Sequence, residues 1–293
     1  MVGKSGFVER NLKYIFPLPA LLFMFILMIF PVGYTLFISL TDWRLTSGRP
    51  MQFVGLGSYL AVITTDRFGL AVWRTFAFTI GVVAAEAVLG VIIALILNRE
   101  FRGKGLLKLF LLLPLVVTPV AIGITFSLFY DPTIGFLNYC LSVLGLPQSG
   151  WVRKASTVLP SLMLVDIWQW TPMIALIVLA GLSSLSPEPH ESAKVDGANA
   201  VQTFFRVTLP MIMPTVLTAI VLRSVDALKT YDIIAAMTRG GPGYSSETLN
   251  LLAYKQSFEY FDMGQASATL VFLFLIVLAF SLMVMQVRKK FEL

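Results

Sequence analysis

Charged side chains recur at every third position within a long apolar stretch in the second half of the chain. They are Arg223, Asp226, Lys229 and Asp232, with Tyr231 beside the last of them. Residues three apart are neighbours on a helix, so opposite charges in this pattern can pair along its surface. Such a row suits a path for a hydrophilic solute, and it equally suits an ionic seam that holds helices together. The sequence leaves both interpretations open.

A second polar group lies within another apolar stretch, residues 157–181. Indole rings pack on the C–H faces of sugar rings, and carboxylates and amides hydrogen-bond hydroxyl groups, so this group suits a carbohydrate. The alternative for each Trp is an aromatic anchor at the depth of the lipid headgroups. The predicted substrate pathway consists of Asp166, Trp168, Gln169, Trp170, Arg223, Asp226, Lys229, Tyr231 and Asp232.

The composition places these residues in a membrane protein. Of the 293 residues 57% are hydrophobic and only 13% are charged, and the mean hydropathy is +0.82. A soluble domain carries about 25% charged residues. The net charge of +6 suits cytoplasmic loops that face anionic lipid, and we expect no nucleic-acid partner. With Cys140 and His190 as the single Cys and His, the sequence excludes an internal disulfide and argues against a metal site.

Apolar segments long enough to cross a bilayer, at about 20 residues each, occur six times. They are residues 15–40, 71–97, 106–130, 157–181, 211–236 and 264–287. Small residues such as Gly90 and Ala94 permit close helix packing in the second span, and Glu86 there needs a partner or a water-filled cavity. The predicted fold class is an all-α polytopic membrane protein with six transmembrane helices.

The positions of Lys and Arg predict the orientation of these spans. With the amino terminus inside, the inner segments carry more of the 22 Lys and Arg residues than the outer ones, and Lys4, Arg10 and Lys290 contribute to this bias. The rule is most reliable for short loops, such as residues 98–105. We therefore expect cytoplasmic amino and carboxyl termini, with residues 186–214 inside the cell.

The polar loop between the fourth and fifth spans begins with a predicted short helix. Ser186 can cap it and Pro187 fits its first helical position. Gly197 can adopt a positive φ and end it.

A second short helix is predicted directly after that glycine. Asn199 followed by Gln202 forms a capping signal at its start. Leu209-Pro210 should end it, because the residue before a proline avoids the α region. The loop is thus expected to fold as helix, glycine turn and helix.

This loop resembles the EAA loop of the membrane permease subunits of bacterial ABC importers. The resemblance rests on Glu191-Ser192-Ala193, Asp196-Gly197-Ala198 and Leu209-Pro210, with Ser192 in place of the first Ala of the family pattern. The later part of the chain is similar too, through residues 238–243, 246–249 and 261–268. These segments resemble carbohydrate-uptake permeases of the maltose and glycerol-phosphate type, which are MetI-like components of binding-protein-dependent transport systems.

The resemblance implies the type I ABC importer permease fold and an assembly. Residues 1–70 would be a cytoplasmic tail, an added span and an outer loop, and residues 71–290 a five-helix core with the coupling loop at 186–210. A second homologous permease, two ATPase subunits and an extracytoplasmic binding protein would complete the importer in the bacterial inner membrane. The residues that couple to the ATPase would be Glu191, Ser192, Ala193, Asp196, Gly197 and Ala198.

The implied function is the import of a sugar or sugar-like solute, powered by the partner subunits. ATP and Mg²⁺ would be used there, and this chain, without a Walker A motif, would bind no cofactor and would not be an enzyme. The competing hypothesis is a secondary, ion-coupled carrier that uses the charges of residues 223–232 as a relay. We find no nucleophile and base pair that would indicate an intramembrane enzyme.

Overall fold

The computed structural model describes residue 11 and residues 13–289, which divide into two compact units. The first unit holds the chain up to Thr65 together with Ala253–Phe272, and the second holds Asp66–Leu252 and the chain from Leu273 onward. In the described residues all regular structure is helical, and β pairing is limited to two isolated bridges. The predicted all-α class is confirmed, while Lys4, Arg10 and Lys290 lie outside the described residues.

Long apolar helices match the predicted membrane spans. Five are continuous: Lys13–Ile38, Asp66–Leu97, Val158–Ser183, Ala200–Leu228 and Met263–Gln286. The third span is instead a pair of helices, α6 (Lys104–Val116) and α7 (Pro119–Phe129), bent by 99°. The described chain therefore has six spans when this broken pair counts as one.

The third predicted span, residues 106–130, is present but is broken into two helices. Val117 and Thr118 leave the helical conformation, with ψ of 138° and 142°. Pro119 accounts for this break, because a proline disfavours the α region for the residue before it and is well suited to open the next helix. Pro114 lies inside α6, so only one of the two prolines ends a helix.

In the first unit the first span contains a widened turn just before a proline. The span runs through α2 (Leu18–Met24), the π-helical η1 (Phe25–Ile29) and α3 (Phe30–Ile38). The N–H of Phe30 donates to the carbonyl of Phe25, five residues back, and Pro31 follows. A π-turn is a known way for a helix to absorb a local disruption, so the span continues through the proline.

The rest of the first unit is tied together by polar contacts around the start of α15 (Met263–Lys289). Asp262 accepts from the N–H of Gln265 at 3.1 Å, which caps this helix, and its other oxygen lies 2.8 Å from Arg44 Nε. Ser58, in α4 (Gly57–Ile63), donates to the carbonyl of Thr41 at 2.6 Å. These contacts join the loop after the first span to the residues before the last span.

The second unit is built on three helices: α5 (Asp66–Leu97), α9 (Val158–Ser183) and α12 (Leu209–Leu228). Gly90 marks the closest approach of α5 and α9, since a Cβ placed there would lie 2.7 Å from Ile174 Cγ2. This confirms the expected close packing of the second span. The core around this approach consists of Ala94, Ile174, Val178, Leu182, Ile212, Val216 and Ala219.

The fifth span starts earlier than predicted, because its helix runs through Leu209-Pro210. The helix begins with α11 (Ala200–Thr203), passes through the π-helical η3 (Phe204–Thr208) and continues as α12. The N–H of Leu209 donates to the carbonyl of Phe204, five residues back, so a π-turn again precedes the proline. The expectation that Leu209-Pro210 ends a helix is therefore wrong.

The fifth span also ends earlier than predicted, at Leu228 rather than at residue 236. Its last turn tightens, with Lys229 N–H donating to Asp226 O at 3.1 Å and Thr230 N–H to Ala227 O at 3.2 Å. Such i→i−3 bonds are common where a helix stops. A short separate helix, α13 (Asp232–Met237), follows, and α14 (Leu249–Phe258) comes after the Gly-rich loop.

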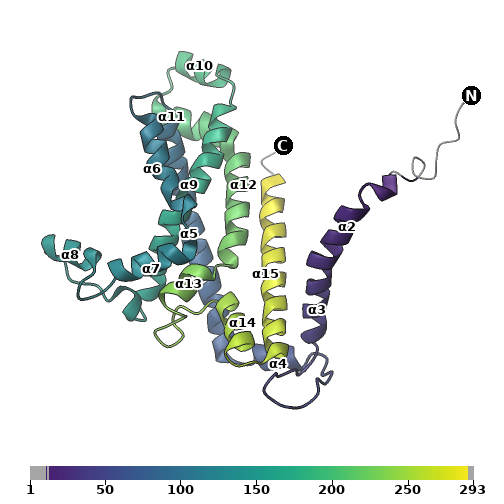
Figure 1. The fold of residues 1–293 in the computed structure, drawn as a ribbon. Coiled ribbons are helices and arrows are strands. Elements are labelled where there is room, and N and C mark those ends of the chain that lie inside the picture. The colour runs from purple at the N-terminus through teal and green to yellow at the C-terminus, as the bar shows by residue number, and fades with distance from the viewer. Residues whose placement is uncertain (1–10, 12, 290–293) are drawn as a thin grey trace, which may run out of the picture. The chain divides into compact units, whose positions relative to one another are not determined.

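The two ends of the second unit carry different elements (Figure 1). At one end α10 (Glu188–Val195) lies beyond the ends of α9 and α12. Toward the opposite end lie α7 and α13, with the short helix α8 (Phe136–Val143) reached through a loop from α7. The polar coupling loop and the charged end of the fifth span are thus separated by the length of the helices.

Candidate solute pathway and coupling loop

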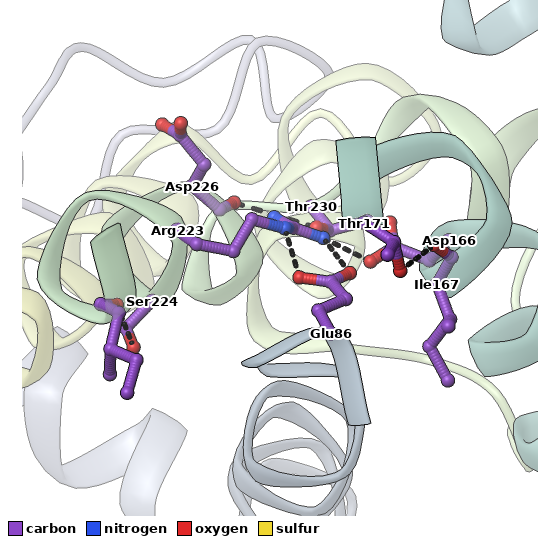
Figure 2. A network of polar contacts seen from close by, with 9 residues as sticks. Glu86, Asp166, Ile167, Thr171, Arg223, Ser224, Asp226 and Thr230 are labelled. Carbon is purple, nitrogen blue, oxygen red and sulfur yellow. Dashed lines mark hydrogen bonds and ion pairs between the residues drawn. The ribbon is translucent and has the colours of Figure 1, made fainter. Parts of the chain in front are cut away.

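A buried guanidinium joins the three central helices of the second unit. Figure 2 shows Arg223 of α12 between Glu86 of α5 and Asp166 of α9. Arg223 Nε lies 2.8 Å from Glu86 Oε2 and Nη2 lies 3.2 Å from Oε1, while Nη2 also contacts Asp166 Oδ2. All three side chains are at most 1% exposed. We call Glu86, Asp166 and Arg223 the buried charge cluster.

This cluster replaces the pairing expected along the fifth span. Arg223 pairs with carboxylates of two other helices, whereas only Lys229 and Asp226 form the predicted i,i+3 contact, at 3.6 Å. A guanidinium offers a planar fork that matches a carboxylate in two bonds, and such pairing offsets part of the cost of burying the charges. Glu86 thereby has the partner that its position in the second span required.

The cluster opens onto a cavity of about 540 Å³ at the end of α12. Trp170 stands beside it, with Arg223 Cζ at 5.2 Å from the indole ring centroid, within the range of a cation–π contact. Most of the predicted pathway residues line this cavity. The lining is Pro119, Asp166, Trp170, Arg223, Asp226, Lys229, Thr230, Tyr231, Asp232, Ile233 and Asn250.

Two of the predicted pathway residues lie elsewhere. Trp168 packs against Phe126 at 5.3 Å between ring centroids and lines a separate, largely apolar hollow. Gln169 is buried, and its Nε2 donates to the carbonyl of Val117 at 3.3 Å, at the break between α6 and α7. Their neighbours on α9 face the cavity, so the helical period separates residues that are adjacent in the sequence.

Four cavity residues escaped the sequence-based prediction: the apolar Pro119 and Ile233, and the polar Thr230 and Asn250. Asn250 belongs to α14, which follows the Gly-rich loop in the sequence. It lines the cavity, and its Nδ2 donates to the carbonyl of Lys229 at 2.6 Å. Thr230 contributes from the turn after α12. No periodicity marks either polar residue, because Thr230 lies in a turn and Asn250 at the start of the short helix α14.

The Gly-rich loop before α14 is held by a buried carboxylate. Glu247, fully buried, receives two bonds from Arg67, from Nε and from Nη2, each at 2.7 Å. Arg67 Cζ also lies 4.0 Å from the ring centroid of Tyr244. Thr238 and Ser246 join the two ends of the loop through their hydroxyls at 2.9 Å. Nothing in the local sequence pairs Arg67 with a residue 180 positions later.

The first helix of the coupling loop ends as predicted at Gly197 but begins one residue later than predicted. Gly197 has φ of 77° and ends α10 in a Schellman motif, with its N–H on the carbonyl of Lys194 at 3.1 Å and Ala198 N–H on that of Ala193 at 2.9 Å. Ser186 Oγ accepts from Glu188 N–H at 3.4 Å, and Pro187 occupies the N-cap, one residue earlier than expected. The helix–turn–helix arrangement is therefore set by main-chain bonds.

The start of the second helix follows its capping signal. Asn199 and Gln202 form a reciprocal capping box, with both side chain to backbone bonds at 2.9 Å. The predicted coupling residues occupy the exposed side of α10 and the turn: Glu191, Ser192, Asp196 and Gly197 are exposed, Ala198 is half-buried and Ala193 is buried. Most of the predicted coupling residues are therefore accessible at the surface of the described chain.

A helical bundle with a polar cavity at one end and an exposed capped loop at the other is a polytopic membrane transport protein. Comparison with known proteins agrees with this class. Residues 86–292 match the family model described as binding-protein-dependent transport system inner membrane component. The chain belongs to this family, and it is an inner-membrane permease component.

Individual relatives and a solved structure extend the match over nearly the whole chain. The chain is 37% identical over 91% of its length to a probable ABC transporter permease of Sinorhizobium fredii, of which 86% is covered. It is 33% identical to the trehalose/maltose transport system permease of Thermococcus litoralis, over 99% of this chain and 97% of that protein. None of these matches supports an ion-coupled carrier.

The solved structure shows the fold. The chain superimposes on a bacterial ABC transporter involved in the import of the acidic polysaccharide alginate, with a TM-score of 0.83, 20% identity and coverage of 97% of each chain. The type I ABC importer permease fold predicted from the sequence is thereby confirmed.

Proposed function

We propose that this chain is a permease subunit of an ATP-driven importer that carries a sugar or sugar-like solute into the cytoplasm. The observation that carries the proposal is the 33% identity over 99% of the chain to a trehalose/maltose permease. The cavity at the end of α12 supports it, because carboxylates, an amide and an indole ring are the groups that bind a polyhydroxylated solute. The cavity is the proposed path of the solute.

The proposed partners follow from the family and the coupling loop. Two ATPase subunits and an extracytoplasmic binding protein serve this chain, and a second homologous permease completes the pathway. ATP and Mg²⁺ are used by the ATPase subunits, because this chain carries no Walker A motif and binds no cofactor of its own. The chain itself is a transport subunit and not an enzyme.

The ATPase docks on the exposed side of α10. Val195 at the tip is 88% exposed, an apolar side chain left uncovered in the described chain, and Val201 and Phe205 nearby are 64% and 61% exposed. Glu191 and Asp196 beside them offer carboxylates to basic groups of the ATPase. Apolar anchors with a charged rim are typical of a protein interface, and here they surround the Schellman turn at Gly197.

This docking requires the orientation proposed from Lys and Arg, with both termini and α10 in the cytoplasm. The cavity then lies toward the outer half of the bundle, because its lining residues Asp166, Arg223 and Asp226 belong to the halves of α9 and α12 that are remote from the coupling loop. Movement of α10 passes to the cavity through α9 and α12, the two long helices that flank the loop. The division into residues 1–70 and a core at 71–290 stays a prediction.

Uptake by the complete transporter in proteoliposomes tests the proposal. We expect uptake of radiolabelled trehalose or maltose to require this chain, ATP and the binding protein together. Omission of the ATPase should abolish uptake, and an imposed proton or sodium gradient should not restore it. Gradient-driven uptake without the ATPase would instead establish the ion-coupled carrier.

A further inference from the structure

We infer that the cavity at the end of α12 selects uncharged polyhydroxyl solutes and rejects anionic ones, such as uronic acids or sugar phosphates. This inference rests on the proposed function and names the substrate class of the same cavity. The fold alone does not determine this substrate class, because a chain with the same fold belongs to an importer of an acidic polysaccharide. The charge of the lining therefore has to decide which solutes enter.

The lining carries an excess of negative charge. Asp166, Asp226 and Asp232 face two cations, Arg223 and Lys229. Glu86 lies directly behind Arg223 and adds a further carboxylate. Charges near a protein surface interact across several ångströms with a strength of a few kcal/mol at an effective dielectric constant of about 20. An anionic solute in the cavity is thus repelled.

Both cations are already neutralised by carboxylates of this chain. Arg223 is shared between Glu86 and Asp166 (Figure 2), and Lys229 lies 3.6 Å from Asp226. A carboxylate or phosphate on a solute would have to displace one of these acidic groups. Displacing a buried carboxylate from Arg223 is costly, so Arg223 forms no ready anion site. The pair of Lys229 and Asp226 is half-exposed, and its two opposite charges add no net positive charge to the cavity.

Hydrogen-bond acceptors, by contrast, remain for a solute with hydroxyl groups. Asp166 Oδ1 is buried and has no partner within the described residues. Asp232 forms no ion pair in the described part of the chain and is exposed at the start of α13. Hydroxyl groups donate to such oxygens, and the face of Trp170 beside Arg223 can pack on a sugar ring.

Binding to the complete transporter, held in nanodiscs without ATP or binding protein, tests the inference. The probes are trehalose and maltose, with trehalose 6-phosphate and glucuronate as the anionic counterparts. We expect the neutral sugars to bind at least about tenfold more tightly than the anionic ones at low salt, and the difference to shrink as salt screens the charges.

Substitutions locate the effect in the cavity. Asp226→Asn with Asp232→Asn should reduce the difference to about threefold or less, chiefly by strengthening anion binding. Lys229→Asn should widen it. Glu100→Gln is the matched control, since its carboxylate pairs with Lys104 in the turn before α6, and it should leave the ratio unchanged.

The outcomes separate the two proposals. If neutral sugars bind and anionic sugars bind equally well or better, or if the double variant leaves the ratio unchanged, the charge selection is wrong and sugar import stands. If neither kind of sugar binds and ATP-driven sugar uptake is also absent, the proposed function fails and the inference fails with it.

Discussion

Different kinds of contact hold the polar groups of the buried charge cluster and those of the coupling loop in place. The cluster takes one side chain from each of three helices and buries all three. Apart from a hydrogen bond between His190 and Thr208 at 3.0 Å, the loop uses bonds between residues at most five positions apart and leaves most of its side chains in solvent. One site therefore depends on tertiary packing, whereas the other is a local structure that can move as a body.

Substitutions in the two regions should therefore have different effects. In the cluster a substitution leaves a buried charge without its partner, so it should affect folding first. In the loop a substitution changes a surface at the end of two long helices, so it should affect transmission and leave insertion intact.

The largest effect is expected for Arg223→Met. The change leaves the carboxylates of Glu86 and Asp166 buried without a counter-charge, which costs about 3–5 kcal/mol for a broken buried pair. The purified transporter should unfold at a much lower temperature or fail to accumulate in membranes. Adding Glu86→Gln and Asp166→Asn should restore much of the stability, and an unaltered melting temperature in the single variant would contradict the role of the cluster.

A smaller loss of stability is expected for Gly90→Ala, at the approach of α5 and α9 that holds the cluster together. The new Cβ would lie 2.7 Å from Ile174 Cγ2, and overpacking of this kind costs about 1–3 kcal/mol. Thermal unfolding of the purified protein measures the loss. Gly105→Ala in α6 meets nothing within 4 Å and is the matched control, which should match the unsubstituted protein.

Gly197→Val tests the other side of the comparison. Its φ of 77° disfavours a β-branched residue by roughly 1–2 kcal/mol, a strain confined to an exposed turn. Membrane insertion and melting temperature should change little, while ATP-driven uptake should fall strongly. Gly145→Val, with a similar φ of 71° in the loop after α8 and open space around it, is the control. Equal uptake by the two variants would argue against the coupling role.

The smallest effect concerns the loop after α7, which Asp131 holds through two nearby N–H groups and through Arg153. The N–H groups of Thr133 and Ile134 donate to Asp131 Oδ1 at 2.8 and 3.2 Å and, with Arg153 at 2.9 Å, lower the pKa of this carboxyl. Because the folded pKa is depressed, the stabilisation is present above the ordinary aspartate value, near 3.9, and is lost as pH falls through the lowered pKa.

Hydrogen exchange of residues 131–157 measures this dependence. Relative to the intrinsic exchange rate at each pH, the loop should exchange faster below about pH 4 in the unsubstituted protein, and Asp131→Asn should show much of that relative increase already at neutral pH. The increase should stay confined to this loop. Faster exchange of α9 as well would mean that the loop is part of a larger cooperative unit.

The features of the fold that the sequence predicted correctly depend on residues that are close together in the chain. The six apolar segments are present, Gly197 ends α10, and Asn199 and Gln202 form the expected capping box. The error at Leu209-Pro210 is also instructive. A proline is expected to end a helix, yet a π-turn ahead of it let the helix continue, as it did ahead of Pro31.

The class of the protein and most of the local form of the coupling loop follow from the order of the residues, because apolar length, capping and glycine conformation act between residues a few positions apart. The partner of Arg223, by contrast, depends on how the helices pack. Its neighbour at i+3 is Asp226, but it binds Glu86, 137 residues earlier, and Asp166. A buried guanidinium needs carboxylates that are buried with it, and helix packing alone determines which carboxylates those are.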